Sequence, residues 1–156
     1  IDDSARKMGR TPTEADFEPV TWKMYENGQR QSGGDYLLAI QDLQSVSRDF
    51  GDFFTDCDVW LTPTLAQPPV PIGYFDYSPE KRDEHLAHLG DFTGFTLIAN
   101  ATGQPAISVP LHWTDEGLPV GIQLTGRYGE EGLLLRLAAQ LEQARPWADR
   151  RPPVIV

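Results

Sequence analysis

Apolar residues recur at helical spacing along three stretches of the chain. After Asp35 they return every three, four or seven positions, which predicts one long helix with Tyr36, Ile40, Leu43, Phe50 and Phe54 on its apolar face. A second stripe predicts a helix that starts at Ser78-Pro79 and ends at Gly103 and Pro105, with apolar residues Leu86, Leu89, Phe92, Phe95 and Ile98. The third stripe belongs to a helix that two glutamates open after Gly129 and Pro146 ends, and consists of Leu134, Leu137, Ala138 and Leu141.

Two shorter helices are expected before Asp35. The segment Thr11-Pro-Thr-Glu14 has the form of a capping box with proline at the first helical position, so a short helix should begin there. Pro19 interrupts that helix and starts a second one, which Gly28 ends. Gly33-Gly34 then marks a break before the long helix.

Three apolar runs predict β-strands, over residues 58–62, 106–110 and 119–125. In the last run Val120, Ile122 and Leu124 share one face, and Gly121 and Gln123 share the other. Three prolines make residues 66–73 an extended loop. About three strands among five helices place the chain in the α/β class, although so few strands do not form an independent sheet of ordinary width.

Composition narrows the function classes. With 156 residues the chain fits one domain and can bury a core, and no apolar run approaches the ~20 residues of a transmembrane helix. The net charge of −10 and the scattered arginines argue against a nucleic-acid partner, because phosphate binding needs clustered basic residues. The single cysteine, Cys57, excludes an internal disulfide and favours a reducing compartment. We therefore expect a cytoplasmic protein without a membrane partner.

Three groups of residues could carry chemistry, and a structural role explains each of them better. Ser108, His112 and Asp115 have the composition of a catalytic triad, but no Gly-x-Ser-x-Gly elbow presents the serine. His85 and His88 have helical spacing, yet no third histidine follows at ligand spacing, so a solvated helix face is the better interpretation. In the glycine series Gly126–Gly132 two glutamates would repel phosphate. We expect no metal and no cofactor.

Four segments together resemble the C-terminal part of the amidase signature family, serine hydrolases that cleave carboxamide bonds. They are Asp58–Thr64, Asn100–Pro110, Gly117–Gly126 and Glu130–Arg136, in the family's order. The resemblance implies a mixed β-sheet sandwiched between helices, with the remaining strands in an absent N-terminal half. It divides residues 1–156 into a helical lead-in (1–57), a strand and helix core (58–144) and a tail (145–156).

The resemblance also says where the catalytic groups lie. The family's nucleophilic serine, bridging serine and catalytic lysine belong to the N-terminal half, in part within a Gly/Ser-rich tract. Gln31-Ser-Gly-Gly34 has one serine where that tract needs two, and a linker between helices explains it better. We therefore expect no catalytic residue here and an inactive isolated chain. The whole enzyme would attack the amide carbonyl with an activated serine and pass through an acyl-enzyme.

Substrate binding is the role that the resemblance leaves to this chain. In the family, the helix and turn before the Asn-x-x-Gly-x-Pro motif contribute to the acyl pocket. This implies a pocket wall made of Phe92, Phe95, Thr96 and Asn100. The alternative from the residues alone is that the two phenylalanines belong to the core and that Asn100 bonds its own backbone at a helix end.

Two classes of function remain open after the sequence analysis. The chain is either part of an amidase or a non-catalytic binding or scaffolding domain derived from one. In the first case its partners are a small-molecule amide and the N-terminal half, and an unpaired sheet edge would favour self-association as a homo-oligomer. The substrate is open between small aliphatic amides, aryl amides, cyclic oligoamides and glutaminyl transfer RNA.

Overall fold

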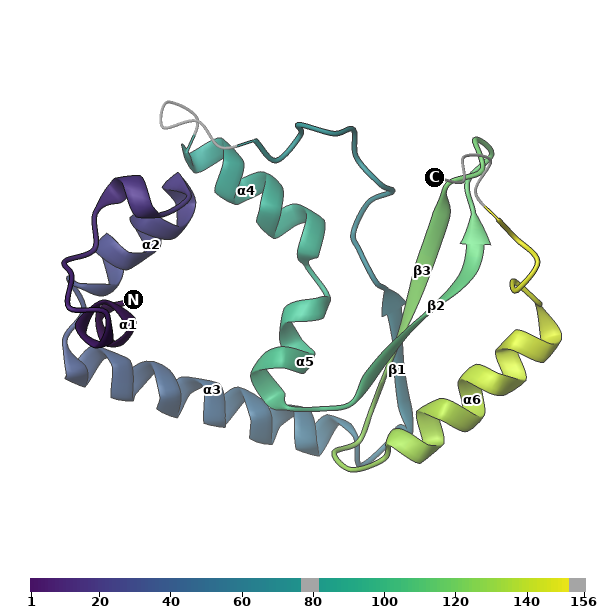
Figure 1. The fold of residues 1–156 in the computed structure, drawn as a ribbon. Coiled ribbons are helices and arrows are strands. Elements are labelled where there is room, and N and C mark those ends of the chain that lie inside the picture. The colour runs from purple at the N-terminus through teal and green to yellow at the C-terminus, as the bar shows by residue number, and fades with distance from the viewer. Residues whose placement is uncertain (77–81, 152–156) are drawn as a thin grey trace.

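The computed structural model describes residues 1–76 and 82–151 (Figure 1). In the lead-in the helices are α1 (Asp2–Lys7), the 3-10 helix η1 (Glu14–Asp16), α2 (Pro19–Gly28) and α3 (Gly33–Phe53). The strands are β1 (Val59–Pro63), β2 (Ala106–Trp113) and β3 (Pro119–Gly126), and the remaining helices are α4 (Arg82–Thr93), α5 (Thr96–Thr102) and α6 (Glu131–Ala144). The α/β class and the three expected strands are confirmed. No helix within the described ranges is long and apolar enough to cross a membrane.

The sheet has the order β1-β3-β2, and both strand pairs are antiparallel. The strands of this part of the chain therefore form an antiparallel sheet, without the parallel pairs that a mixed sheet needs. Leu124 of β3 lies opposite Leu61 of β1 on one side and Ile107 of β2 on the other. Among the described residues β1 and β2 are the outer strands, so each has one edge without a neighbour in the sheet.

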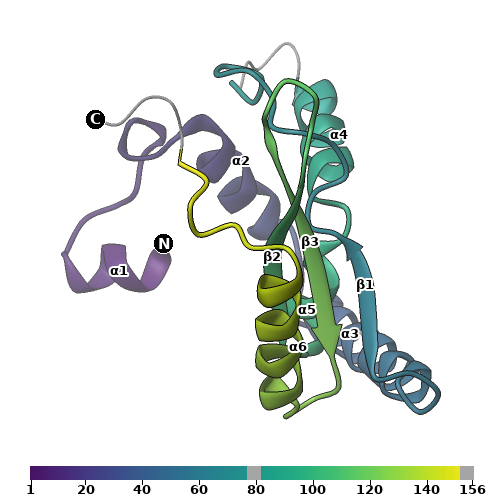
Figure 2. The same cartoon turned by 90° about the vertical axis from the view of Figure 1, so that its right-hand side faces the viewer.

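One face of the sheet is covered by α6, which packs on β2 and β3 (Figure 2). Val109, Leu124 and Leu134 are the buried centre of this contact. The predicted stripe on α6 is confirmed, because Leu134 is buried and Leu137, Ala138 and Leu141 pack around it. Gly126 allows the close approach of helix and strand, since a Cβ there would lie 3.3 Å from Leu134.

The opposite face of the sheet is polar at its centre. Thr62, Gln123 and Thr125 are each at most 5% exposed, and the hydroxyl of Thr62 has no hydrogen-bond partner within the described part of the chain. Near this face lie α3 and α5, which contact each other. Trp60 packs against the rings of Phe50 and Phe53 from α3, at 5.6 and 6.3 Å between centroids.

The starts of the helices in the lead-in agree with the sequence prediction at α2 and differ from it at η1 and α1. Pro19 is the first residue of α2, as expected. The first capping box, however, joins Thr13 to Asp16 instead of Thr11 to Glu14, and it caps the 3-10 helix η1. The bond from the Arg10 guanidinium, and then that from Thr13, lower the pKa of Asp16 to about 2. The prediction also missed α1, which the contacts of Asp2 with Tyr25 and Gln29 join to α2.

The long helix α3 begins two residues before the predicted Asp35. Ser32 is its N-cap: the Asp35 N–H donates to the Ser32 hydroxyl at 3.1 Å, and Ser32 donates back to the Asp35 carboxylate. These bonds from the Ser32 hydroxyl and N–H lower the pKa of Asp35. The segment Gln31-Ser-Gly-Gly34 is therefore a helix start as well as a linker.

The predicted single helix before Gly103 is two helices. Thr93 ends α4 and Thr96 begins α5, with Gly94 and Phe95 between them. Glycine is a weak helix former, and the Thr96 hydroxyl donates to the Thr93 carbonyl, which helps to satisfy the interrupted backbone. Gly103 ends α5 in the left-handed conformation, as expected, with φ of 76°. The predicted start at Ser78-Pro79 lies outside the described residues.

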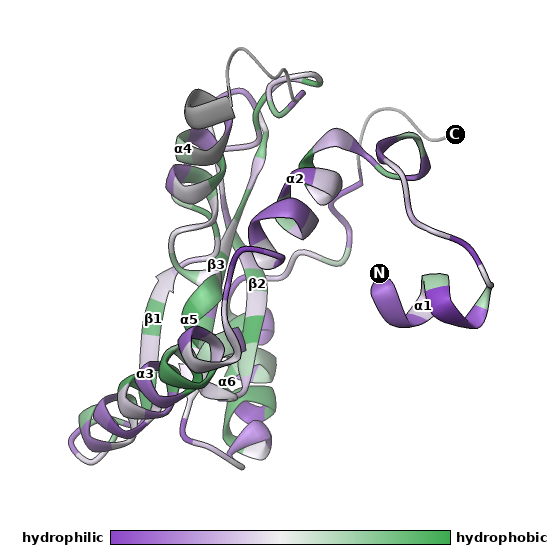
Figure 3. Cartoon of the chain, turned by 90° about the vertical axis from the view of Figure 1, so that its left-hand side faces the viewer, coloured by the Kyte–Doolittle hydropathy of each residue, from purple (hydrophilic) through white to green (hydrophobic). Residues whose placement is uncertain are grey.

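Much of the apolar surface of α3 is exposed. Tyr36, Leu37 and Leu38 are 62–68% exposed, and Figure 3 shows apolar and polar segments alternating along this helix. Of the predicted stripe, Ile40 and Phe50 are half-buried and Phe54 is buried. The described residues therefore cover only part of this apolar stripe.

Candidate functional site

Two hydroxyl groups meet above the central strand of the sheet. Thr64 Oγ1 and Ser108 Oγ lie 2.6 Å apart and share a hydrogen bond. Thr64 follows β1 and Ser108 belongs to β2, while Gly121 of β3 lies between them. A Cβ at position 121 would stand 2.7 Å from Thr64 Oγ1 and 2.8 Å from Ser108 Oγ. Glycine is therefore the residue that leaves room for this bond.

The strand register explains why these three residues meet. Pro63 lies opposite Ile122, and the Thr64 N–H donates to the Gly121 carbonyl at 2.9 Å, which extends the β1–β3 ladder by one residue. Ser108 lies opposite Gln123 on the other side of β3. Gly121 and Gln123 point to the same face because side chains alternate along a strand. Thr64 and Ser108 therefore approach each other diagonally across β3.

A small cavity of about 190 Å³ opens beside this hydroxyl pair. Its walls come from the loop after β1 and from the start of β3, and the lining residues are Thr64, Leu65, Gln67, Pro68, Pro69, Ser108, Pro119, Val120 and Gly121. These residues carry no formal charge. Apart from the hydroxyl pair and Gln67, the side chains of the lining are apolar or absent.

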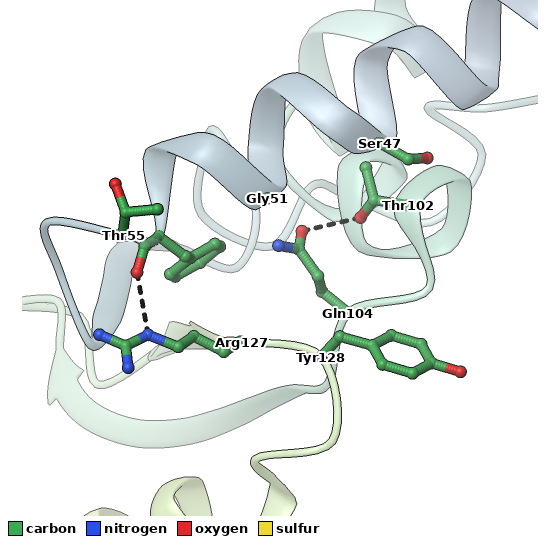
Figure 4. A pocket seen from close by; sticks show the side chains of 8 residues that line it. Ser47, Gly51, Thr55, Thr102, Gln104, Arg127 and Tyr128 are labelled. Atoms are coloured by element: carbon green, nitrogen blue, oxygen red, sulfur yellow. Dashed lines mark hydrogen bonds between the residues drawn. The ribbon is translucent and has the colours of Figure 1, made fainter.

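A larger cavity of about 650 Å³ lies where α3, α5 and the β3–α6 connection meet (Figure 4). Arg127 reaches across it, and its guanidinium donates to the carbonyls of Phe54 at 2.9 Å and Cys57 at 3.3 Å. It also pairs with the exposed carboxylate of Asp58 at 2.9 Å. Arg127 uses its guanidinium for these bonds, which join the segment before β1 to the β3–α6 connection. We therefore interpret the residues around this cavity as structural.

The four predicted pocket residues lie along α4 and α5. The Phe92 ring packs edge-on against Phe75 at 5.0 Å, and its carbonyl accepts a bond from the Ala66 N–H at 3.0 Å. The Phe95 carbonyl accepts from Gln123 Nε2 at 3.5 Å, so this residue joins the helix break to the sheet. Thr96 bonds within the break, and Asn100 is exposed on α5.

These four residues line neither the 190 Å³ cavity nor the 650 Å³ cavity. Phe92 is nevertheless linked to the smaller one, because Ala66, which bonds its carbonyl, lies within the loop that forms the cavity wall. Their role in substrate binding stays a prediction.

The serine and histidine candidates from the sequence make contacts that a structural role explains. The hydroxyl of Ser108 bonds to Thr64, and His112 lies beyond a bulge in β2, opposite Val120. His88 stacks on the Tyr74 ring at 4.9 Å. Within residues 1–76 and 82–151, no three His, Cys, Asp or Glu side chains are grouped so that they could hold a metal ion.

Comparison with known proteins gives consistent matches. The family model named Amidase matches residues 1–135. AmiC of Mycobacterium tuberculosis (strain H37Rv) is 43% identical over 154 residues, which cover 96% of this chain and 31% of AmiC. The 6-aminohexanoate-cyclic-dimer hydrolase of Pseudomonas sp. (strain NK87) is 30% identical over 161 residues, covering 99% of this chain and 33% of the hydrolase. A solved structure of 6-aminohexanoate cyclic dimer hydrolase superposes with a TM-score of 0.89 at 30% identity, covering 98% of this chain and 33% of that one.

The sequence matches and the fold agree on one class of protein, the amidases. Because the family model covers most of the chain, the chain belongs to the amidase family. It spans about a third of the length of the relatives it matches. The resemblance found in the sequence is thereby confirmed.

Proposed function

We propose that this chain is the C-terminal portion of a serine amidase that hydrolyses carboxamide bonds through an acyl-enzyme. The family match, which spans a third of each relative, carries this proposal. The Ser-Ser-Lys residues would come from an upstream portion. Together with this chain, that portion forms what we call the parent enzyme, which we place in the cytoplasm.

The role of the chain in this enzyme is to complete the sheet and to contribute part of the acyl pocket. The outer strand β1 has a free edge among the described residues, and Leu61 on it is 61% exposed. Phe53 and Trp60 form an apolar cluster next to this edge. Such an edge, flanked by large apolar side chains, suits a further strand of the upstream portion.

The hydrolysis of amides tests the proposal directly. The parent enzyme should release ammonia or an amine from at least one amide in a panel that includes the 6-aminohexanoate cyclic dimer, the substrate named for a relative at 30% identity. Residues 1–156 alone should stay at the rate of buffer, because the expected nucleophile and base are absent. Assays of ammonia release and amine derivatisation measure the activity of the parent enzyme and of residues 1–156 alone. Turnover by the chain alone that survives repurification and disappears in Ser32→Ala or Ser108→Ala would contradict the assignment.

The acyl-pocket role of Phe92, Phe95, Thr96 and Asn100 predicts a change of specificity. In the parent enzyme, Phe95→Ala should shift the relative kcat/KM between a short and a long acyl chain by about fivefold or more, because a ring that shapes the pocket discriminates by chain length. Leu97→Ala is the matched control, since Leu97 lies two residues after Phe95, in the first turn of α5, and is 58% exposed. Equal loss of kcat/KM for all substrates, together with a lower melting temperature, would support the core role instead.

A further inference from the structure

The small cavity beside the Thr64–Ser108 pair has a polar end of defined chemistry. A hydroxyl group can donate one hydrogen bond and accept two. In the shared bond of 2.6 Å one of the two hydroxyls uses its proton and the other uses a lone pair. The pair therefore keeps one O–H donor and several acceptor positions. It can donate to a carbonyl oxygen and accept from an N–H group at the same time.

The rest of the cavity favours a neutral, compact ligand. Leu65, Val120 and three prolines supply an apolar wall, and proline holds its backbone angle fixed. No Lys, Arg, Asp, Glu or His is among the lining residues, so an ionic group would lose its hydration without a partner of opposite charge. The volume of about 190 Å³ is several times what a single water molecule needs. This suits an amide group with a few carbon atoms.

The position of the cavity connects it with the predicted acyl wall. Leu65, Gln67, Pro68 and Pro69 line the cavity, and Ala66 within the same loop donates to the Phe92 carbonyl. A ligand held by the hydroxyl pair would therefore lie against the loop that α4 fixes on its other side.

We propose that Thr64, Ser108 and the small cavity beside them form a subsite for a neutral carboxamide group. Its use in the enzyme, to hold an amide of substrate or product, rests on the proposed function. The binding itself needs only residues 1–156. Thr64 and Ser108 are the specificity-determining residues of this subsite, because they supply both hydrogen bonds.

Ligand-observed saturation-transfer NMR on residues 1–156 tests the subsite, and this measurement tolerates self-association of the protein. Propionamide should bind saturably, and propionate, of similar size but charged, should bind several-fold more weakly. Ser108→Ala and Thr64→Val should each weaken propionamide binding by about fivefold to tenfold, which is the usual effect of one lost hydrogen bond. Thr64→Ser keeps a hydroxyl and should retain binding.

Ser47→Ala is the matched control, because the Ser47 hydroxyl bonds to the Leu43 carbonyl and lies at the other cavity. Far-ultraviolet circular dichroism checks that each variant is folded. No saturable propionamide binding, equal binding of propionate, or equal binding by a folded Ser108→Ala variant would overturn the subsite. Propionamide binding in a chain whose parent enzyme hydrolyses no amide would support the subsite and reject the proposed function. Amide hydrolysis by the parent enzyme, with no propionamide binding to residues 1–156, would support the proposed function and reject the subsite.

Discussion

Co-expression with the upstream portion is expected to convert residues 1–156 from a self-associating, inactive chain into a soluble complex that hydrolyses amides. The exposed side chains give the physical reason. Leu61 on the free edge of β1 is 61% exposed, Phe53 beside it is 47% exposed, and Tyr36, Leu37 and Leu38 on α3 are 62–68% exposed. Burying one such side chain contributes about 1.5–3 kcal/mol, so copies of the isolated chain should associate through these surfaces.

Light scattering and calorimetry measure this outcome. The isolated chain should form oligomers or aggregates, and the co-expressed pair should form one complex that releases amine from a substrate amide. A monodisperse monomer that melts cooperatively would instead show that residues 1–156 close their own core, and would favour an autonomous binding domain. Because enzymes accelerate their reactions by about a millionfold or more, the return of activity is the largest effect expected for this protein.

A charged substitution on the edge of β1 distinguishes pairing at this edge from nonspecific association of exposed apolar surfaces. Lysine on an edge strand discourages pairing with another chain. Leu61→Lys should therefore reduce self-association of the isolated chain and also weaken its complex with the upstream portion. Leu135→Lys is the control, since Leu135 is 63% exposed on α6 and lies away from β1. Equal effects of both variants would argue against a specific role of the edge.

The parts of the fold that local pattern determines were predicted from the sequence. Leu134, Leu137, Ala138 and Leu141 lie on one face of a helix by spacing alone, and they pack on the sheet as expected. The three strands follow from short apolar runs, although β2 extends to Trp113, three residues further than predicted, after a bulge. A bulge depends on the partner strand and leaves no clear local pattern.

The errors arose where tertiary contacts decide the local structure. The apolar stripe through Phe92 and Phe95 continues past Gly94, so its spacing predicted one helix, whereas the chain breaks there and the Phe95 carbonyl turns to Gln123, 28 positions later. Helix α1 has few apolar residues, and its contact with α2 depends on polar bonds from Asp2. Spacing within one segment carries no information about such partners.

The candidate site was only partly visible in the sequence. The sequence offers Ser108 as a member of a triad with His112 and Asp115, whereas in the structure its hydroxyl bonds to Thr64, 44 positions away. The pairing follows from the strand order and register, which join β1 to β3 and β3 to β2. The alternation along β3 correctly predicts that Gly121 and Gln123 share a face. A glycine inside a strand is a known sign of close approach, and this signal could have pointed to the site.

Substitution of Gly121 is expected to have a large effect on stability. Gly121→Ala should lower the free energy of unfolding by about 1–3 kcal/mol, because its Cβ would lie 2.7 Å from Thr64 Oγ1, 2.8 Å from Ser108 Oγ and 3.1 Å from Thr64 Cβ. Gly121→Val, with two more methyl groups, should prevent the strands from pairing in this register. Denaturant midpoints of the co-expressed complex measure both variants.

The sign of the change in the free energy of unfolding distinguishes steric crowding at Gly121 from the usual effect of a glycine-to-alanine substitution. Alanine in place of glycine normally stabilises regular structure by about 0.5–1 kcal/mol, and Gly51→Ala in α3 should do so, because its Cβ would meet nothing within 4 Å. Ser108→Ala removes one of the two crowding oxygens, so it should recover part of the stability lost in Gly121→Ala. The two changes would then be non-additive, as expected for residues in contact. A Gly121→Ala variant as stable as the unsubstituted protein would show that the strands separate easily at this point, and that the hydroxyl pair does not fix the loop after β1.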